Sequence, residues 1–119
     1  MIKTIALIRR KPGISREEFI RHYEEVHAPL AMACLPGLKG YVRNFVVTPP
    51  GGPEPAFDVV SEFWFEDAAA LQAVHAFLRS EDARELREDE ALFIDSASIR
   101  ACAVEEHGCS RLGAGDDPS

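Results

Sequence analysis

The chain has 119 residues, 46% of them hydrophobic, which suits one folded domain. Its 13 Lys and Arg against 20 Asp and Glu give a net charge of -7, which argues against nucleic acid or an anionic membrane as a partner. No apolar stretch approaches the roughly 20 residues that cross a bilayer, and three cysteines without CxxC spacing suggest neither disulfides nor a thiolate metal site. We therefore expect a cytoplasmic protein with free thiols.

The first half of the chain predicts a strand, a helix and a second strand. Residues 2–9 are β-branched and apolar and end at a Lys-Pro-Gly turn, which indicates a strand. Ser15 stands three residues before Glu18, a capping box that predicts a helix start. Pro29 predicts a kink or restart of this helix near residues 27–29, because its ring clashes with the preceding turn. The helix should end at residues 35–37, before a strand over residues 38–48.

The second half begins with a proline- and glycine-rich loop over residues 49–55. A strand over residues 57–65 follows, with Phe63 and Phe65 on one side and Glu62 and Trp64 on the other. Asp67 can cap a helix that runs to residue 78, and a second short helix should run from residue 80 to about residue 90. A last strand is expected over residues 98–105. We assign residues 1–107 to the domain and predict that residues 108–119 form a disordered tail.

This β-α-β-β-α-β order predicts an α+β, ferredoxin-like fold, in which a four-stranded antiparallel sheet carries its helices on one face. The other face would display Val60, Trp64 and half of the first and last strands, which is too much apolar surface for a monomer. A homodimer that buries this face would leave a cavity between each sheet and its own elements. The sequence therefore predicts self-association and a small-molecule pocket.

Several short segments, taken in order and spacing, resemble the EthD family over about residues 2–105. They are residues 27–31 (HAPLA), 36–37 (PG), 40–41 (GY), 62–67 (EFWFED), 89–90 (DE) and 93–95 (FID). The resemblance implies a dimeric α+β barrel, related in fold to muconolactone-type isomerases and to cofactor-free monooxygenases of aromatic polyketides. It names no reaction, because proteins similar to this sequence include accessory proteins of ether degradation, decarboxylases, dehydratases and an isomerase.

His27 is the first candidate for chemistry, because it lies on the apolar side of its helix beside the break at Pro29. An imidazole acts as a general base or acid near neutral pH. The alternative is a core histidine that bonds a free carbonyl of the broken helix, and the residues alone favour it. The resemblance favours the pocket role, since the histidine before Pro-Leu-Ala recurs as a pocket residue in similar proteins.

Asp95 is the second catalytic candidate, because it precedes the last strand and could orient His27 or contact substrate; the alternative is an aspartate that caps a turn. Tyr41, Glu62 and Trp64 on the central strands are candidate substrate-binding residues. For Trp64, packing at a dimer interface is the stronger alternative.

The remaining histidines give little support for a metal site. His75 should be packed or half-exposed on its helix, and His22 and His107 should face solvent. The histidines lack HxH or HExxH spacing, and the chain has no GxGxxG, GxxxxGK[ST] or GxSxG motif. We expect neither a metal nor a nucleotide cofactor.

Two functions remain open. The first is a small cofactor-independent enzyme that acts on an aromatic, polyketide-like or lactone-type molecule by His-mediated proton transfer, as in isomerisation, decarboxylation, dehydration or cofactor-free oxidation. The second is a non-catalytic small-molecule-binding or accessory protein that uses the same cavity. An anionic substrate would require Arg9, Arg43 or Arg100 to point into the cavity.

Overall fold

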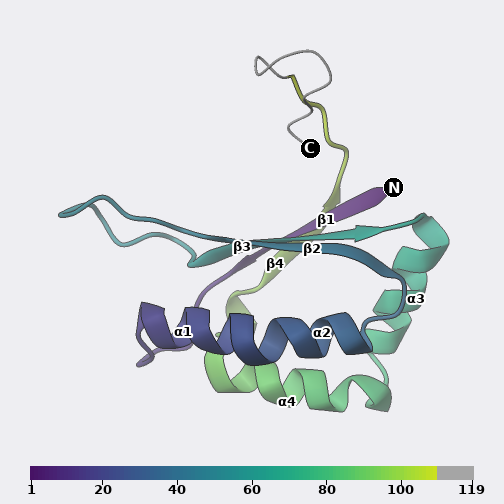
Figure 1. Cartoon of the computed structure of the whole chain (residues 1–119), viewed down its shortest axis with the longest axis horizontal. Helices are drawn as coiled ribbons and strands as arrows, with labels where there is room; N and C mark the ends of the chain where they lie inside the picture. The colour runs from purple at the N-terminus through teal and green to yellow at the C-terminus, as the bar shows by residue number, and fades with distance from the viewer. Residues whose placement is uncertain (110–119) are drawn as a thin grey trace.

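The computed structural model describes residues 1–109, and in this part of the chain a four-stranded antiparallel sheet carries its helices on one face (Figure 1). The strands are β1 (Ile2–Ile8), β2 (Leu38–Phe45), β3 (Val59–Phe65) and β4 (Arg100–Val104), and they lie in the order β2-β3-β1-β4. The predicted α+β, ferredoxin-like fold is confirmed. None of the helices within residues 1–109 has the length and hydropathy of a membrane span.

The first helical segment runs from residue 16 to residue 34 and widens in the middle. It consists of α1 (Arg16–His22), a π-helical turn η1 (Tyr23–His27) and α2 (Ala28–Cys34). Ser15 caps α1 by accepting a hydrogen bond from the amide of Glu18 at 3.1 Å. Pro29 has no amide hydrogen, so the α-helical bond to residue 25 cannot form. The segment responds with a π turn, in which the Ala28 amide bonds the Tyr23 carbonyl.

The second helical segment follows β3. Asp67 caps α3 (Ala68–Leu78) by accepting a hydrogen bond from the Ala70 amide at 2.9 Å. A 3-10 turn, η2 (Glu81–Ala83), leads into α4 (Arg84–Phe93), which extends beyond the predicted end near residue 90. Another 3-10 turn, η3 (Ser96–Ser98), leads to β4. Residues 110–119 of the tail that we predicted to be disordered lie outside the described residues.

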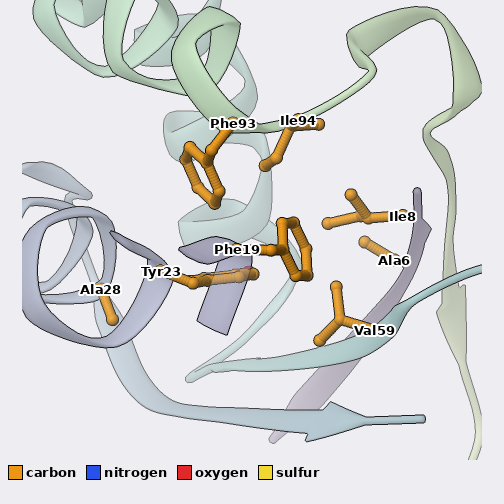
Figure 2. Close-up of a cluster of buried hydrophobic side chains, with 8 residues drawn as sticks. All are labelled: Ala6, Ile8, Phe19, Tyr23, Ala28, Val59, Phe93 and Ile94. Carbon is orange, nitrogen blue, oxygen red and sulfur yellow. The ribbon is translucent and has the colours of Figure 1, made fainter. Parts of the chain in front are cut away.

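The hydrophobic core joins the helices to the sheet around Phe19, which is fully buried (Figure 2). Its ring packs edge-on against Tyr23, with 6.0 Å between centroids, and lies 5.6 Å from the ring of Phe93. Val59 and Ile8 supply the sheet side of this cluster. The core therefore fixes η1 and the end of α4 against one another, and these two elements carry the site described below.

The helix-facing side of the sheet, here called the inner face, is unevenly filled. On β2 and β3 it carries the aromatic residues Tyr41, Phe45, Phe63 and Phe65. In the middle of β1 and along β4 it carries small side chains, with Thr4 opposite Ala103 and Ala6 opposite Ala101. Small side chains beneath the helices leave space that aromatic ones would occupy.

The opposite side of the sheet, here called the outer face, is not covered by any helix of residues 1–109 (Figure 1). The register places Lys3 opposite Trp64 and Ile5 opposite Glu62, so all four residues share this face. Lys3 forms an ion pair with Glu62 and lies 5.1 Å from the centre of the Trp64 ring. Gly40 makes room for that ring, because a Cβ atom there would meet Trp64 at 3.2 Å. The face thus combines apolar side chains with a polar cluster in which Lys3 pairs with Glu62 and Glu106.

Candidate functional site

A cavity of about 270 Å³ lies between the inner face and the helices. Its floor includes the small residues of β1 and β4, and most of its lining is apolar. Lysine and arginine are absent from the lining in the described part of the chain. The polar side chains that line it are those of Thr4, Tyr23, His27, Tyr41, His75 and Glu90.

His27 is held at the wall of this cavity by a buried carboxylate. Only 4% of the residue is exposed, and its Nδ1 lies 2.8 Å from Oδ2 of Asp89. Rings of Tyr23 and Phe93 flank the imidazole, with centroids at 5.5 and 5.0 Å. Because Asp89 accepts, the hydrogen of a neutral His27 lies on Nδ1, and the lone pair of Nε2 is left on the cavity side.

The π turn explains how one carboxylate reaches two histidines. Oδ1 of Asp89 lies 2.9 Å from Nε2 of His22, five residues before His27. In a regular α-helix, residues five apart point about 140° away from each other. In η1 the hydrogen bond spans five residues, which brings such residues back to the same side. The break at Pro29 therefore does position His27, through widening rather than a kink.

The electrostatics of the site favour a neutral imidazole. Burial lowers the pKa of His27 below its usual value, and the hydrogen bond with Asp89 opposes this effect only in part. His27 is therefore uncharged at neutral pH and able to accept a proton. The nearby negative charge of Asp89 stabilises the imidazolium that would form during a reaction.

Glu90 is a second titratable group on the cavity wall. Its Oε1 lies 3.9 Å from Nε2 of His27, too far for a hydrogen bond. Burial, reinforced by the charge of Asp89, raises the pKa of Glu90 to about 7, while Arg87 acts in the opposite direction. The carboxyl group thus changes its charge near neutral pH, beside an imidazole that does not.

Hydroxyl groups form the polar side of the cavity nearest β2. The Tyr23 hydroxyl lies 2.6 Å from that of Tyr41 and 2.7 Å from Oγ of Ser61. Burial raises the pKa of both tyrosines, so both stay protonated at neutral pH. The Tyr41 ring stacks on Phe63 with 4.4 Å between centroids, which fixes its orientation. These hydroxyls can hydrogen-bond a ligand oxygen but cannot act as bases near pH 7.

The sequence-predicted site residues are only partly brought together. His27 and Tyr41 both line the cavity. Glu62 and Trp64 lie on the outer face, across the sheet from it. Asp95 precedes η3, where its carbonyl accepts a hydrogen bond from the Ser98 hydroxyl at 2.6 Å, and it is not part of the cavity lining. The carboxylate that bonds His27 is that of Asp89.

Sequence reasoning gave Asp89 and Glu90 no role, and it misplaced His22. His22 was expected to face solvent, but its ring is bonded to Asp89 and packs 4.5 Å from that of Phe93. A signal for Asp89 was available, because it lies three residues after Leu86 and four before Phe93, on the buried face of α4. Within residues 1–109, no group of three His, Cys, Asp or Glu side chains is arranged to hold a metal ion.

The sequence model of the EthD domain family matches residues 11–97, which is most of the chain and includes η1, β2, β3 and α4. The chain belongs to the EthD family. A search of curated proteins gave no match. The match begins after β1 and ends before β4, so the two strands that carry small residues beside the cavity lie outside the matched segment.

Solved structures share this EthD fold. An EthD family protein from Bacillus halodurans is 24% identical, with a TM-score of 0.64 over 90% of this chain and 100% of its own. HapK from Hahella chejuensis is 14% identical, with a TM-score of 0.63 over 95% of this chain and 99% of its own. A dimeric protein of ferredoxin-like fold from Bacteroides fragilis is 9% identical, with a TM-score of 0.58 over 88% of this chain and 95% of its own. At these identities the similarity shows the fold alone.

Proposed function

We propose that the chain is a small cofactor-independent enzyme that moves a proton on an aromatic, polyketide-like or lactone-type molecule bound in the cavity. The observation that carries this proposal is the buried His27–Asp89 pair, with Nδ1 bonded to the carboxylate and Nε2 on the cavity side. A desolvated imidazole held by one carboxylate is a common proton-transfer device. The lowered pKa of His27 keeps this base unprotonated at neutral pH.

In the proposed reaction, Nε2 of His27 takes a proton from a carbon or oxygen atom of the substrate. The resulting imidazolium is stabilised by Asp89, which keeps its negative charge while Nδ1 remains bonded to it. The proton then returns to a different atom or leaves with a departing group. Tyr41 hydrogen-bonds a substrate oxygen, and the aromatic walls limit the access of water.

A probe that reports on a base in an apolar cavity tests this proposal while the substrate is unidentified. In 5-nitrobenzisoxazole, loss of the C3 proton to a base forms a nitrile and breaks the N–O bond, which releases a coloured phenolate. We expect the protein to accelerate this reaction. His27→Ala should lower the rate at least about 100-fold, which is the usual contribution of a general base. A His27→Ala rate within threefold of wild type contradicts the proposal.

The second candidate is a non-catalytic binding protein, and the mostly apolar lining of the cavity favours it equally. The two candidates differ in what His27 does to a bound molecule. We expect His27→Ala to bind 2-naphthol within about threefold of wild type while losing the proton-transfer activity. A wild type that binds 2-naphthol but does not accelerate the benzisoxazole reaction favours the binding protein.

We further propose that the protein forms a homodimer through the outer face. Ile5, Val42 and Trp64 lie on this face, and 42% of Val42 is exposed in the single chain. The dimeric neighbour of ferredoxin-like fold offers a precedent for the fold, not for this chain. Light scattering coupled to size-exclusion chromatography should give twice the chain mass of 13.1 kDa; the mass of one chain at micromolar concentration contradicts the proposal.

A further inference from the structure

We propose that Glu90 faces the bound molecule beside His27 and makes the cavity selective for uncharged ring compounds with a carbonyl or hydroxyl oxygen, against carboxylates of the same shape. This inference rests on the proposed use of the cavity and narrows its substrate class.

The first support is the absence of a cation to hold an anion. Neither lysine nor arginine contributes to the lining, as far as residues 1–109 are concerned. Arg43 is bound by Glu24 at 2.7 Å, and Arg100 donates to the backbone carbonyls of residues 97 and 99. An anionic ligand would therefore lose its hydration without gaining a counter-ion, which is costly in an apolar cavity.

The second support is the position of the Glu90 carboxyl group. It lines the cavity 3.9 Å from Nε2 of His27, and 29% of its side chain remains exposed. Burial and the neighbouring Asp89 are what perturb its pKa, and no hydrogen bond from the described residues contributes. A carboxyl group without a protein partner at a cavity wall is free to hydrogen-bond a ligand oxygen.

The third support is that the Glu90 carboxyl group and the His27 imidazole have complementary hydrogen-bonding capacities. When Glu90 is protonated, it can donate to a carbonyl or hydroxyl oxygen of the ligand while the lone pair of His27 accepts a neighbouring proton. When Glu90 is ionised, it repels a carboxylate and still accepts a hydrogen bond from a hydroxyl group. The ionised state therefore disfavours an anion, and both charge states suit an uncharged oxygen function.

The selectivity narrows the reactions proposed above. A substrate that enters as a carboxylate, as in a decarboxylation, meets Glu90 rather than an arginine. Isomerisation of an uncharged ketone needs one proton to leave a carbon and another to reach the carbonyl oxygen, and dehydration also needs a C–O bond to break so that the protonated hydroxyl group leaves as water. In the first step, the C–H bond breaks, His27 takes the proton, the electron pair forms a C=C bond, and the carbonyl oxygen takes the proton of Glu90. His27 and Glu90 are then charged, and a reverse transfer to the product restores both.

The test compares the binding of 2-naphthol and 2-naphthoate, which share a ring system and differ in charge, at pH 8 by titration calorimetry. We expect wild type to prefer 2-naphthol by at least about tenfold and Glu90→Gln to reduce that preference to about threefold or less. Glu88→Gln serves as the control, because this residue lies on the same helix with 66% of its side chain exposed and pairs with Arg84. It should keep the wild-type preference.

Three results overturn the inference: equal or tighter binding of 2-naphthoate by wild type, an unchanged tenfold preference in Glu90→Gln, or no binding of either compound by wild type. The test is independent of turnover. If the preference for 2-naphthol depends on Glu90 but His27→Ala keeps the proton-transfer activity, the selectivity stands and the proposed enzymatic function fails. If His27→Ala loses that activity but the preference does not depend on Glu90, the function stands and this inference fails.

Discussion

Replacement of Asp89 by asparagine perturbs the pair that carries the proposed function with little change in volume. The Asp89 carboxylate contacts Nδ1 of His27 at 2.8 Å and Nε2 of His22 at 2.9 Å, and it accepts from both. An asparagine has one acceptor oxygen and one NH₂ donor. At one of the two histidines, Asp89→Asn therefore sets a donor against an N–H group, or forces the ring into its other tautomer.

The magnitude follows from these contacts. A hydrogen bond to a charged group contributes about 1.5–3 kcal/mol, so the loss of one of the two should lower the free energy of unfolding by about 2 kcal/mol. If the asparagine NH₂ faces His27, the hydrogen moves to Nε2 and the cavity loses its base. Loss of the carboxylate charge also removes the influence that raises the pKa of His27. Together these changes should slow the benzisoxazole reaction by about 100- to 10,000-fold.

The assay measures phenolate release by wild type, Asp89→Asn and Asp95→Asn at pH 7, with urea unfolding of each protein as the stability readout. Asp95→Asn is the matched comparison, because Asp95 was the carboxylate first expected to orient His27 and it is not part of the cavity lining. We expect its rate to stay within threefold of wild type. A folded Asp89→Asn protein with an unchanged rate, or a large loss in Asp95→Asn, refutes the reasoning.

Further variants test the rest of the account. The pKa of Glu90 is about 7 in the folded state and about 4.3 in the unfolded state. Between pH 4.3 and pH 7 the folded state therefore binds the Glu90 proton and the unfolded state releases it. The contribution of Glu90 to the free energy of unfolding thus falls as the pH rises from 4.3 to above 7. Between pH 5 and pH 8, urea unfolding should show that wild type loses at most about 3 kcal/mol of unfolding free energy relative to Glu90→Gln, since part of the Glu90 side chain is exposed. An equal pH dependence of the two proteins contradicts the raised pKa of Glu90. Phe93→Ala should cost about 3–5 kcal/mol of unfolding free energy, because the ring is buried against Phe19 and His27; a loss under 1 kcal/mol contradicts this. Ala101→Phe should weaken 2-naphthol binding more than tenfold by filling the cavity over β4, with little change in thermal stability; unchanged affinity shows that the ligand binds elsewhere. Ile5→Glu should give a folded monomer by light scattering, because it places a charge on the outer face; an intact dimer shows that another surface associates.

The fold was predictable because its signals are local. Ser15 and Asp67 are helix caps that act within three residues, and both bond the amides that the sequence predicts. Gly37, at φ 72°, lies in the turn between α2 and β2, where a residue without a Cβ adopts a positive φ without strain. Alternation in β3 also placed Phe63 and Phe65 on the helix side and Trp64 on the other.

The geometry at Pro29 was predictable only in part. The missing amide hydrogen shows that one α-helical bond must fail, and the sequence alone does not show whether the helix kinks or widens. Packing decides it, since Tyr23 and His27 must both be buried against Phe93. A kink or a restart was expected; a π turn is present and α2 begins after it at Ala28, and the π turn places His22 and His27 on the same carboxylate.

The carboxylate partner of His27 required long-range information. Asp89 and Asp95 lie six residues apart near the end of the domain, and either one could supply a carboxylate to His27. Asp89 lies on the buried face of α4, whereas Asp95 comes after that helix has ended at Phe93. The helical spacing of Leu86, Asp89 and Phe93 distinguishes them, because it places Asp89 on the apolar side of α4.

The charge and tautomer of His27 test the central claim most directly. Long-range ¹H–¹⁵N correlation spectra of the histidine side chains, assigned with His27→Gln, report both at once. The account predicts a neutral ring at pH 7 with its hydrogen on Nδ1, a pKa below 6.5, and an Nε2 resonance that shifts when 2-naphthol is added. Three results would contradict a base on the wall of the cavity: a His27 ring that is positively charged at pH 7, a neutral ring with its hydrogen on Nε2, or an Nε2 resonance that does not shift when the ligand binds.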